Sequence, residues 1–103
     1  MDGKEGQPWL EDCDRAVAEF NMVAIEAFIQ EWGAGEDVAI TVMQSHPTGD
    51  GIQLDVGPRG VFLVEHATGF VYKLGSDGRL HYRKCAGHIT SVTGKELYRQ
   101  QWW

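Results

Sequence analysis

The sequence lacks several features that would place a protein in a class at once. No apolar run approaches the roughly 18 residues of a membrane-spanning helix, so we expect no membrane segment. The segment Met1–Gln7 is polar and lacks the apolar stretch of a secretory signal. Only two cysteines occur, Cys13 and Cys85. Without a signal they favour free thiols in a reducing compartment, and we expect a cytoplasmic protein.

Basic residues are scarce in the first third of the chain. Residues 1–37 carry ten acids against two bases, whereas residues 38–103 carry five acids and seven bases. Binding to nucleic acid depends on Lys and Arg near the phosphates, so we expect no nucleic-acid partner. The acidic third instead favours a protein partner with a basic surface, or serves only as a solvated face that keeps the protein dissolved.

What is present is an ordinary globular composition. The chain has 103 residues, 43% of them apolar, with four Trp, four Phe and three Tyr. A chain of this length builds one core, so we assign residues 1–103 to a single domain. Residues 1–8, with glycine and proline among charges, form a loose N-terminal lead.

The segment Asp12–Trp32 has the periodicity of a helix. Polar residues recur at steps of three, four and seven and share one face, among them Asp12, Glu19 and Glu26. Asp12 is a candidate N-cap, and Gly33 is a candidate C-terminal stop. A broad apolar face lies opposite, which predicts a helix laid across a sheet. Its members are Val17, Ala24, Phe28 and Trp32, widened by Phe20 and Ile25.

After Asp37, short apolar runs alternate with glycine-rich turns, as in antiparallel strands. Asp77-Gly78 is a hairpin signal, and Thr93 with Glu96 three residues on forms a capping box for a short helix. The predicted strands are Val38–Gln44, Ile52–Val56, Val61–His66, Phe70–Leu74, Leu80–Lys84 and a short sixth, His88–Val92. The fold class is therefore α+β, with one long N-terminal helix packed on a four- to six-stranded antiparallel sheet.

Cys13 is the residue that suggests catalysis. It stands near the start of the helix, where the helix dipole lowers the pKa of a thiol. Asp12-Cys13, with His66 later in the strand region, resembles the small cysteine peptidases that cut peptidoglycan stems. The resemblance implies a hydrolase that uses Cys13 and His66. Against it, the charges of Asp12 and Asp14 oppose a thiolate, and the alternative is a structural thiol.

Three possible metal ligands, His81, Cys85 and His88, fall within eight residues. Structural zinc sites usually show paired Cys-x2-Cys motifs, and only one cysteine is present here. The alternative is a strand face followed by a turn. We therefore expect neither a metal nor a cofactor.

The order of a long helix followed by antiparallel strands is that of cystatin-like folds. Within it, the segment from Val61 to Gly75 reads as a strand, an acid, a Thr-Gly turn, a second strand and a terminal glycine. This segment resembles small cystatin-like bacterial immunity proteins. The resemblance implies a protein that neutralises a toxin by binding it. Small acidic domains of this kind are also typical of phage-encoded inhibitors of bacterial defence.

We accordingly expect a small protein-binding domain without catalysis, an inhibitor or immunity protein. The alternatives are the cysteine hydrolase and a phage structural or assembly module. The predicted interface combines the acidic helix face (Asp12, Glu19, Glu26) with the terminal aromatics Trp102 and Trp103, residues of a type enriched at binding hot spots. Otherwise the two tryptophans dock on the domain itself, and the interface lies in the loops at 46–51 and 57–60.

Overall fold

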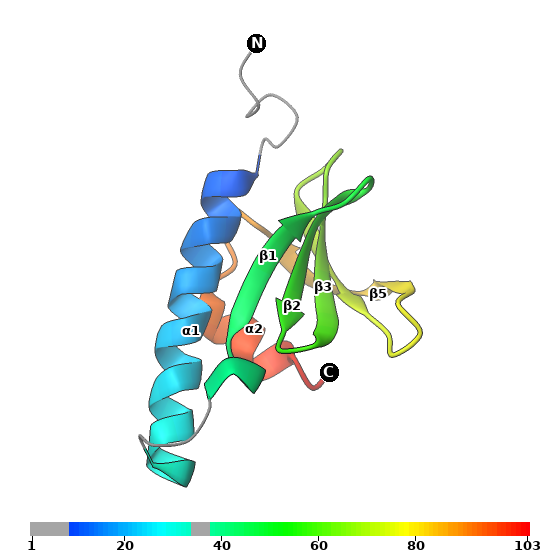
Figure 1. The fold of residues 1–103 in the computed structure, drawn as a ribbon. Coiled ribbons are helices and arrows are strands. Elements are labelled where there is room, and N and C mark those ends of the chain that lie inside the picture. The colour runs from blue at the N-terminus through cyan, green and yellow to red at the C-terminus, as the bar shows by residue number, and fades with distance from the viewer. Residues whose placement is uncertain (1–8, 34–37) are drawn as a thin grey trace.

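The computed structural model describes residues 9–33 and 38–103, and the predicted lead at 1–8 lies outside this part of the chain. Figure 1 shows a long helix lying along one side of a twisted sheet, with a short C-terminal helix beside it. The elements are α1 (Leu10–Trp32), the 3-10 helix η2 (Val38–Ile40), β1 (Met43–Pro47), β2 (Gly51–Val56), β3 (Arg59–Glu65), β4 (Phe70–Leu74), β5 (Leu80–His88) and α2 (Gly94–Gln100). The predicted α+β class is confirmed.

The five strands form one antiparallel sheet in sequence order, so every neighbouring pair is a hairpin. Between β2 and β3 the chain turns on Gly57 and Pro58, with Val56 paired to Arg59. Gly57 has a φ of +58°, and an added Cβ would lie 2.6 Å from the carbonyl oxygen of Ile40. Only glycine meets both conditions, and the tight turn therefore brings η2 against the β2–β3 hairpin.

One face of the sheet and the inner face of α1 form a single core. From α1 come Cys13, Ala16, Phe20 and Ala24, and from the strands come Ile52, Leu54, Val56, Phe62, Val64 and Val71, among others. Leu97 of α2 is also fully buried in this cluster. The apolar face predicted for the helix is therefore correct at Phe20, Ala24 and Phe28, but Trp32 is exposed.

The start of α1 differs from the prediction. The N-cap is Trp9, which offers no side-chain cap, so the assignment of Asp12 as N-cap is wrong. The Trp9 indole Nε1 donates to the carbonyl oxygen of His66 at 2.9 Å, and its ring packs edge-on against His88. The contact of Trp9 with His66 and His88 thus fixes the start of the helix. A capping rule based on neighbouring residues alone cannot predict such a contact.

Asn21 interrupts the apolar side of the helix for a reason that the structure supplies. Its Oδ1 accepts from the backbone N–H of Met43 at 2.7 Å, and its Nδ2 donates to the Met43 carbonyl oxygen at 3.1 Å. This pair of bonds ties α1 to the first residue of β1.

The predicted strand Val38–Gln44 is wrong in position, because residues 38–40 form the 3-10 helix η2 and the strand begins at Met43.

The predicted sixth strand, His88–Val92, is also wrong. β5 continues to His88, and the N–H groups of Ser91 and Val92 both donate to the His88 carbonyl oxygen in a turn. Arg15 of α1 holds this turn by donating to the carbonyl oxygens of Ile89 and Val92, at 2.6 and 3.1 Å. After this turn the chain enters α2, which packs against α1.

α2 sits directly on α1. A Cβ on Gly94 would lie 2.1 Å from the backbone nitrogen of Phe20, so the two backbones touch at a position where only glycine fits. The Gly94 N–H donates to Glu19 Oε1 at 2.9 Å, and Thr93 caps the helix by accepting from the Glu96 N–H, as predicted. No helix in the described residues combines the length and apolar content that a bilayer crossing needs.

Candidate binding surface

Cys13, the candidate nucleophile, lies in the core with no exposed surface. Burial, followed by the charges of Asp14 and Asp12, raises the pKa of its thiol to about 12. The helix dipole does not prevail over burial at this position. A nucleophilic cysteine needs thiolate character and access, and this environment supplies neither.

His66, the proposed partner of Cys13, is exposed at the end of the β3–β4 hairpin. Its backbone carbonyl oxygen receives the Trp9 indole N–H, which places the residue at the N-terminal end of α1. The residue therefore fixes the helix start through its main chain. The hydrolase geometry gains no support from either member of the pair.

Of the three candidate metal ligands on β5, His88 has a structural role, whereas His81 and Cys85 are exposed. His88 has both ring nitrogens engaged, with Nε2 at 2.8 Å from the carbonyl oxygen of Thr68 and Nδ1 at 2.8 Å from the Thr90 hydroxyl. The carbonyl can only accept, so Nε2 carries the proton. Cys85 is exposed, and the described residues contain no group of three or more His, Cys, Asp or Glu that could hold a metal ion.

The three acids of the predicted interface have different surroundings. Glu26 is exposed, and within the described part of the chain its carboxylate accepts one hydrogen bond, from Gln30 Nε2 at 3.4 Å. Glu19 is half-buried and internally engaged, because its Oε1 accepts from Arg15 Nη1 at 2.8 Å and from the Gly94 N–H. Asp12 is also half-buried. Of these acids, Glu26 is the one most open to a partner.

The terminal tryptophans follow α2 and are exposed to different extents. Trp102 is 67% exposed and makes one edge-on ring contact, with Tyr98 at 5.4 Å between centroids. Trp103 is 44% exposed. The tail therefore docks on the domain in part, since Leu97 and Gln101 are buried and Trp103 is more than half covered, while Trp102 stays mostly exposed.

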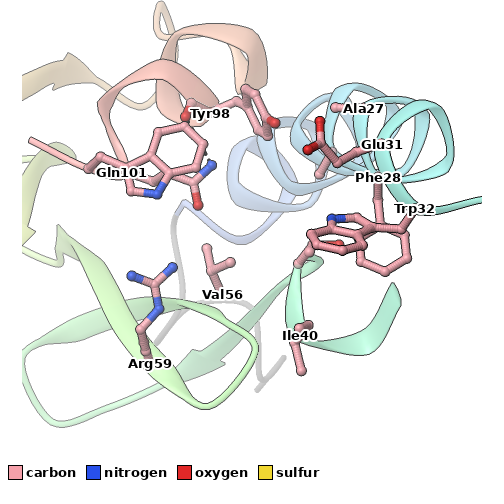
Figure 2. A pocket seen from close by; sticks show the side chains of 12 residues that line it. Ala27, Phe28, Glu31, Trp32, Ile40, Val56, Arg59, Tyr98 and Gln101 are labelled. Carbon is pink, nitrogen blue, oxygen red and sulfur yellow. Dashed lines mark hydrogen bonds between the residues drawn. The ribbon is translucent and has the colours of Figure 1, made fainter. Parts of the chain in front are cut away.

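A groove of about 340 Å³ lies where α1, η2, β2, β3 and α2 meet, and Trp102 is one of its walls. Figure 2 shows Val56 of β2 between Arg59 on one side and Ile40 on the other, with Trp32 and Phe28 of α1 above Ile40. Tyr98 of α2 and Gln101, which follows that helix, complete it. Residues from positions 24 to 102 of the chain therefore converge on one concavity.

The groove has a mixed lining, in which three large exposed apolar side chains stand beside polar ones such as Thr41 and Gln101. Trp32 is 65% exposed, Ile40 62% and Trp102 67%, and they come from α1, η2 and the C-terminal tail. Single exposed apolar side chains are common, but three large ones lining one groove make it a candidate binding site. Trp is also the residue most enriched at binding hot spots.

Two opposite charges stand at the groove, Glu31 from α1 and Arg59 from β3. Neither belongs to any of the ion pairs found among residues 9–33 and 38–103. Both groups are therefore available to a bound molecule. An apolar centre with free charges beside it is the usual anatomy of a protein-binding patch.

The sequence by itself indicates only one wall of this groove. It singles out Trp102, but it predicts Trp32 in the core and Ile40 in a strand. Trp32 carries a usable signal, because it is the last residue before the Gly33 stop and so projects from the end of the helix.

Comparison with protein families, with curated proteins and with solved structures finds no match for this chain.

Proposed function

We propose that this protein acts by binding another protein, as an inhibitor or immunity protein that neutralises its partner. The observation that carries the proposal is the groove with three large apolar walls, Trp32, Ile40 and Trp102, each more than half exposed. Leaving this much apolar surface in water is unfavourable, and covering it with a partner is the stabilising alternative.

The groove suggests what the partner presents. An aromatic or long aliphatic side chain would fill the concavity between the two indoles, where burial of one such side chain contributes roughly 1.5–3 kcal/mol. A carboxylate on the partner would pair with Arg59, and an amine or guanidinium would pair with Glu31. These contacts at the rim would set orientation more than affinity.

Two sequence features support the inhibitor or immunity class. The segment from Val61 to Gly75, which resembles cystatin-like immunity proteins, forms the β3–β4 hairpin at the centre of the sheet. Cys13 and Cys85 are both free thiols, which fits an assignment to the cytoplasm. A neutralising protein of this kind acts by occupying its partner, so it needs no reactive group of its own.

The proposal is tested by affinity capture from the native host. Wild-type protein and the double variant Ile40→Ser/Trp102→Ser are immobilised at equal density, and bound proteins are quantified by mass spectrometry. We expect one protein to be enriched on the wild type and depleted at least tenfold on the variant, since hot-spot truncations cost about 2 kcal/mol or more each. Adding the purified protein should then inhibit the captured partner.

Tyr82→Ser is the matched control. Tyr82 is 64% exposed, close to the exposure of Ile40 and Trp102, but it lies on β5 away from the groove. The control should capture the partner as the wild type does. Equal capture by the groove variant and the wild type would contradict the proposed site, and a captured partner whose activity is unaffected would contradict the inhibitor class.

A further inference from the structure

The outward face of α1 carries a second apolar feature, separate from the core-facing one. Ala18, Met22, Ile25, Ile29 and Trp32 follow one another at steps of four, three, four and three residues. Met22 is 75% exposed and Ile29 42%, and Met22, Ile25 and Ile29 line a shallow depression of about 530 Å³ with Glu26 and Gln30. We refer to the five residues Ala18, Met22, Ile25, Ile29 and Trp32 as the outer seam.

The spacing of the outer seam is that of a helix–helix contact. Alternating steps of three and four keep apolar side chains in line along a helix, which is how one helix presents knobs to the holes of another. A surface helix usually has one apolar face turned inward and a polar face turned outward. α1 departs from this, because Cys13, Ala16, Phe20, Ala24 and Phe28 already supply a complete buried face.

The outer seam is flanked by acids. Asp12, Glu19 and Glu26 recur at seven-residue intervals, each directly following a position of the seam register, and Asp14 lies on the other flank. Arg15 is the one base of α1, and it is committed to Glu19 and to the turn after β5. Arg15 neutralises Glu19, so the net negative charge along the seam comes from Asp12, Asp14 and Glu26, which take part in none of the ion pairs of the described residues.

This charge pattern decides against a second copy of the chain. In an antiparallel pair of seams the flank of Asp12, Glu19 and Glu26 would face itself, and in a parallel pair it would face the flank that holds Asp14. Both arrangements bring acid against acid, and charges at these flanking positions set partner choice in paired helices. A helix with basic flanks is the complement.

We propose that the outer seam docks an α-helix of the partner, one with an apolar stripe at three- and four-residue steps and Lys or Arg along its flanks. This deepens the proposed function and rests on it, because Trp32 belongs both to the seam and to the groove. The partner helix would lie along α1 while a neighbouring side chain enters the groove. Apolar contact supplies the affinity, and the charges supply register and rate of association.

A displayed peptide library tests this chemistry whatever protein the partner is. Helical peptides of four heptads carry a fixed Leu and Ile stripe, and their flanking positions are randomised among Lys, Glu and Gln. Selection is made on the wild-type protein and, in parallel, on Met22→Ser/Ile29→Ser. We expect Lys at the flanks of peptides enriched on the wild type, at least about tenfold weaker binding to the variant, and affinity that falls as salt rises.

Tyr82→Ser is the matched control, since Tyr82 is 64% exposed on β5 and belongs neither to the groove nor to the seam. It should bind the selected peptides as the wild type does. Enrichment of Glu or neutral flanks, or equal binding to wild type and Met22→Ser/Ile29→Ser, would overturn the inference. So would a wild-type dimer in sedimentation equilibrium, or binding to phosphatidylcholine vesicles, that Met22→Ser/Ile29→Ser abolishes, because another copy or a lipid surface would then cover the seam.

The two proposals fail in different ways. If host capture depends on Ile40 and Trp102 but Met22→Ser/Ile29→Ser captures the partner normally, the seam inference is wrong and the proposed function stands. If nothing is captured by the wild type and no peptide is enriched, both are wrong.

Discussion

The two long faces of α1 are both apolar, but only one of them is covered. The inner face, from Cys13 to Phe28, is sealed by the sheet and α2, whereas the outer face leaves Met22 and Ile29 in water. Composition alone does not separate the two faces. The two faces differ because the sheet and α2 cover the inner one, whereas no element of the described chain covers Met22 and Ile29 on the outer one. The outer face is therefore open to an external partner.

The strongest way to break this comparison is to truncate one residue on each face. Phe20 is fully buried, and Phe20→Ala should lower the free energy of unfolding by about 3–5 kcal/mol through lost burial and a cavity. Met22→Ala, two residues away on the open face, should change it by less than about 0.5 kcal/mol. Urea denaturation measures both. Similar losses for the two variants would mean that the outer face is covered within the protein itself.

A similar contrast applies to two acids of the predicted interface. Glu19→Ala removes the acceptor of the Gly94 N–H and the partner of Arg15, and should cost about 1 kcal/mol given that the Glu19 side chain is 41% exposed. Glu26→Ala should leave stability within about 0.5 kcal/mol, since its carboxylate makes one long contact, with Gln30. Thermal unfolding of both variants provides the measurement. If Glu26→Ala were the more destabilising change, the assignment of Glu19 to the α1–α2 contact would be wrong.

The burial of the Cys13 thiol makes the stability of the protein depend on pH in alkali. Burial raises the pKa of the Cys13 thiol from 9.0 to about 12, so the unfolded chain ionises first. The stabilisation from the buried neutral thiol is therefore complete below pH 9 and is lost as the pH rises towards 12. The difference in unfolding free energy between wild type and Cys13→Ala should shrink over that range.

Thiol labelling provides the control for this prediction. Cys85 is exposed on β5 and should react with a thiol reagent in the folded protein, whereas Cys13 should react only after unfolding. A pH-independent difference between wild type and Cys13→Ala, or fast labelling of Cys13 in the native state, would contradict the burial of this thiol.

Much of the fold could be predicted because its signals are local. Phe70–Leu74, the turn at Asp77-Gly78 and the Thr93 cap depend on residues within a few positions of one another, and all three occur as expected. The helix start could not be predicted, because it depends on Trp9 reaching the main chain of His66 across the fold. The turn after His88 likewise depends on Arg15, which lies more than 70 residues earlier.

The candidate surface was only partly predictable for the same reason. Acidity along α1 and the two terminal tryptophans are visible in the sequence. The groove is not, because Trp32, Ile40 and Trp102 come together only after the sheet and α2 have folded. The outer seam escapes prediction because Ile25 and Ile29 fit a single broad apolar stripe, and periodicity does not show which part of such a stripe the sheet covers.

The central claim is that the open groove lined by Trp32, Ile40 and Trp102 binds a protein partner. A titration of the captured partner by isothermal calorimetry tests it most directly. Wild type, Ile40→Ser/Trp102→Ser and the control Tyr82→Ser are compared at one salt concentration. We predict a Kd at least about 100-fold weaker for the groove variant and within about twofold of wild type for Tyr82→Ser. A groove variant that binds as tightly as wild type would contradict the claim.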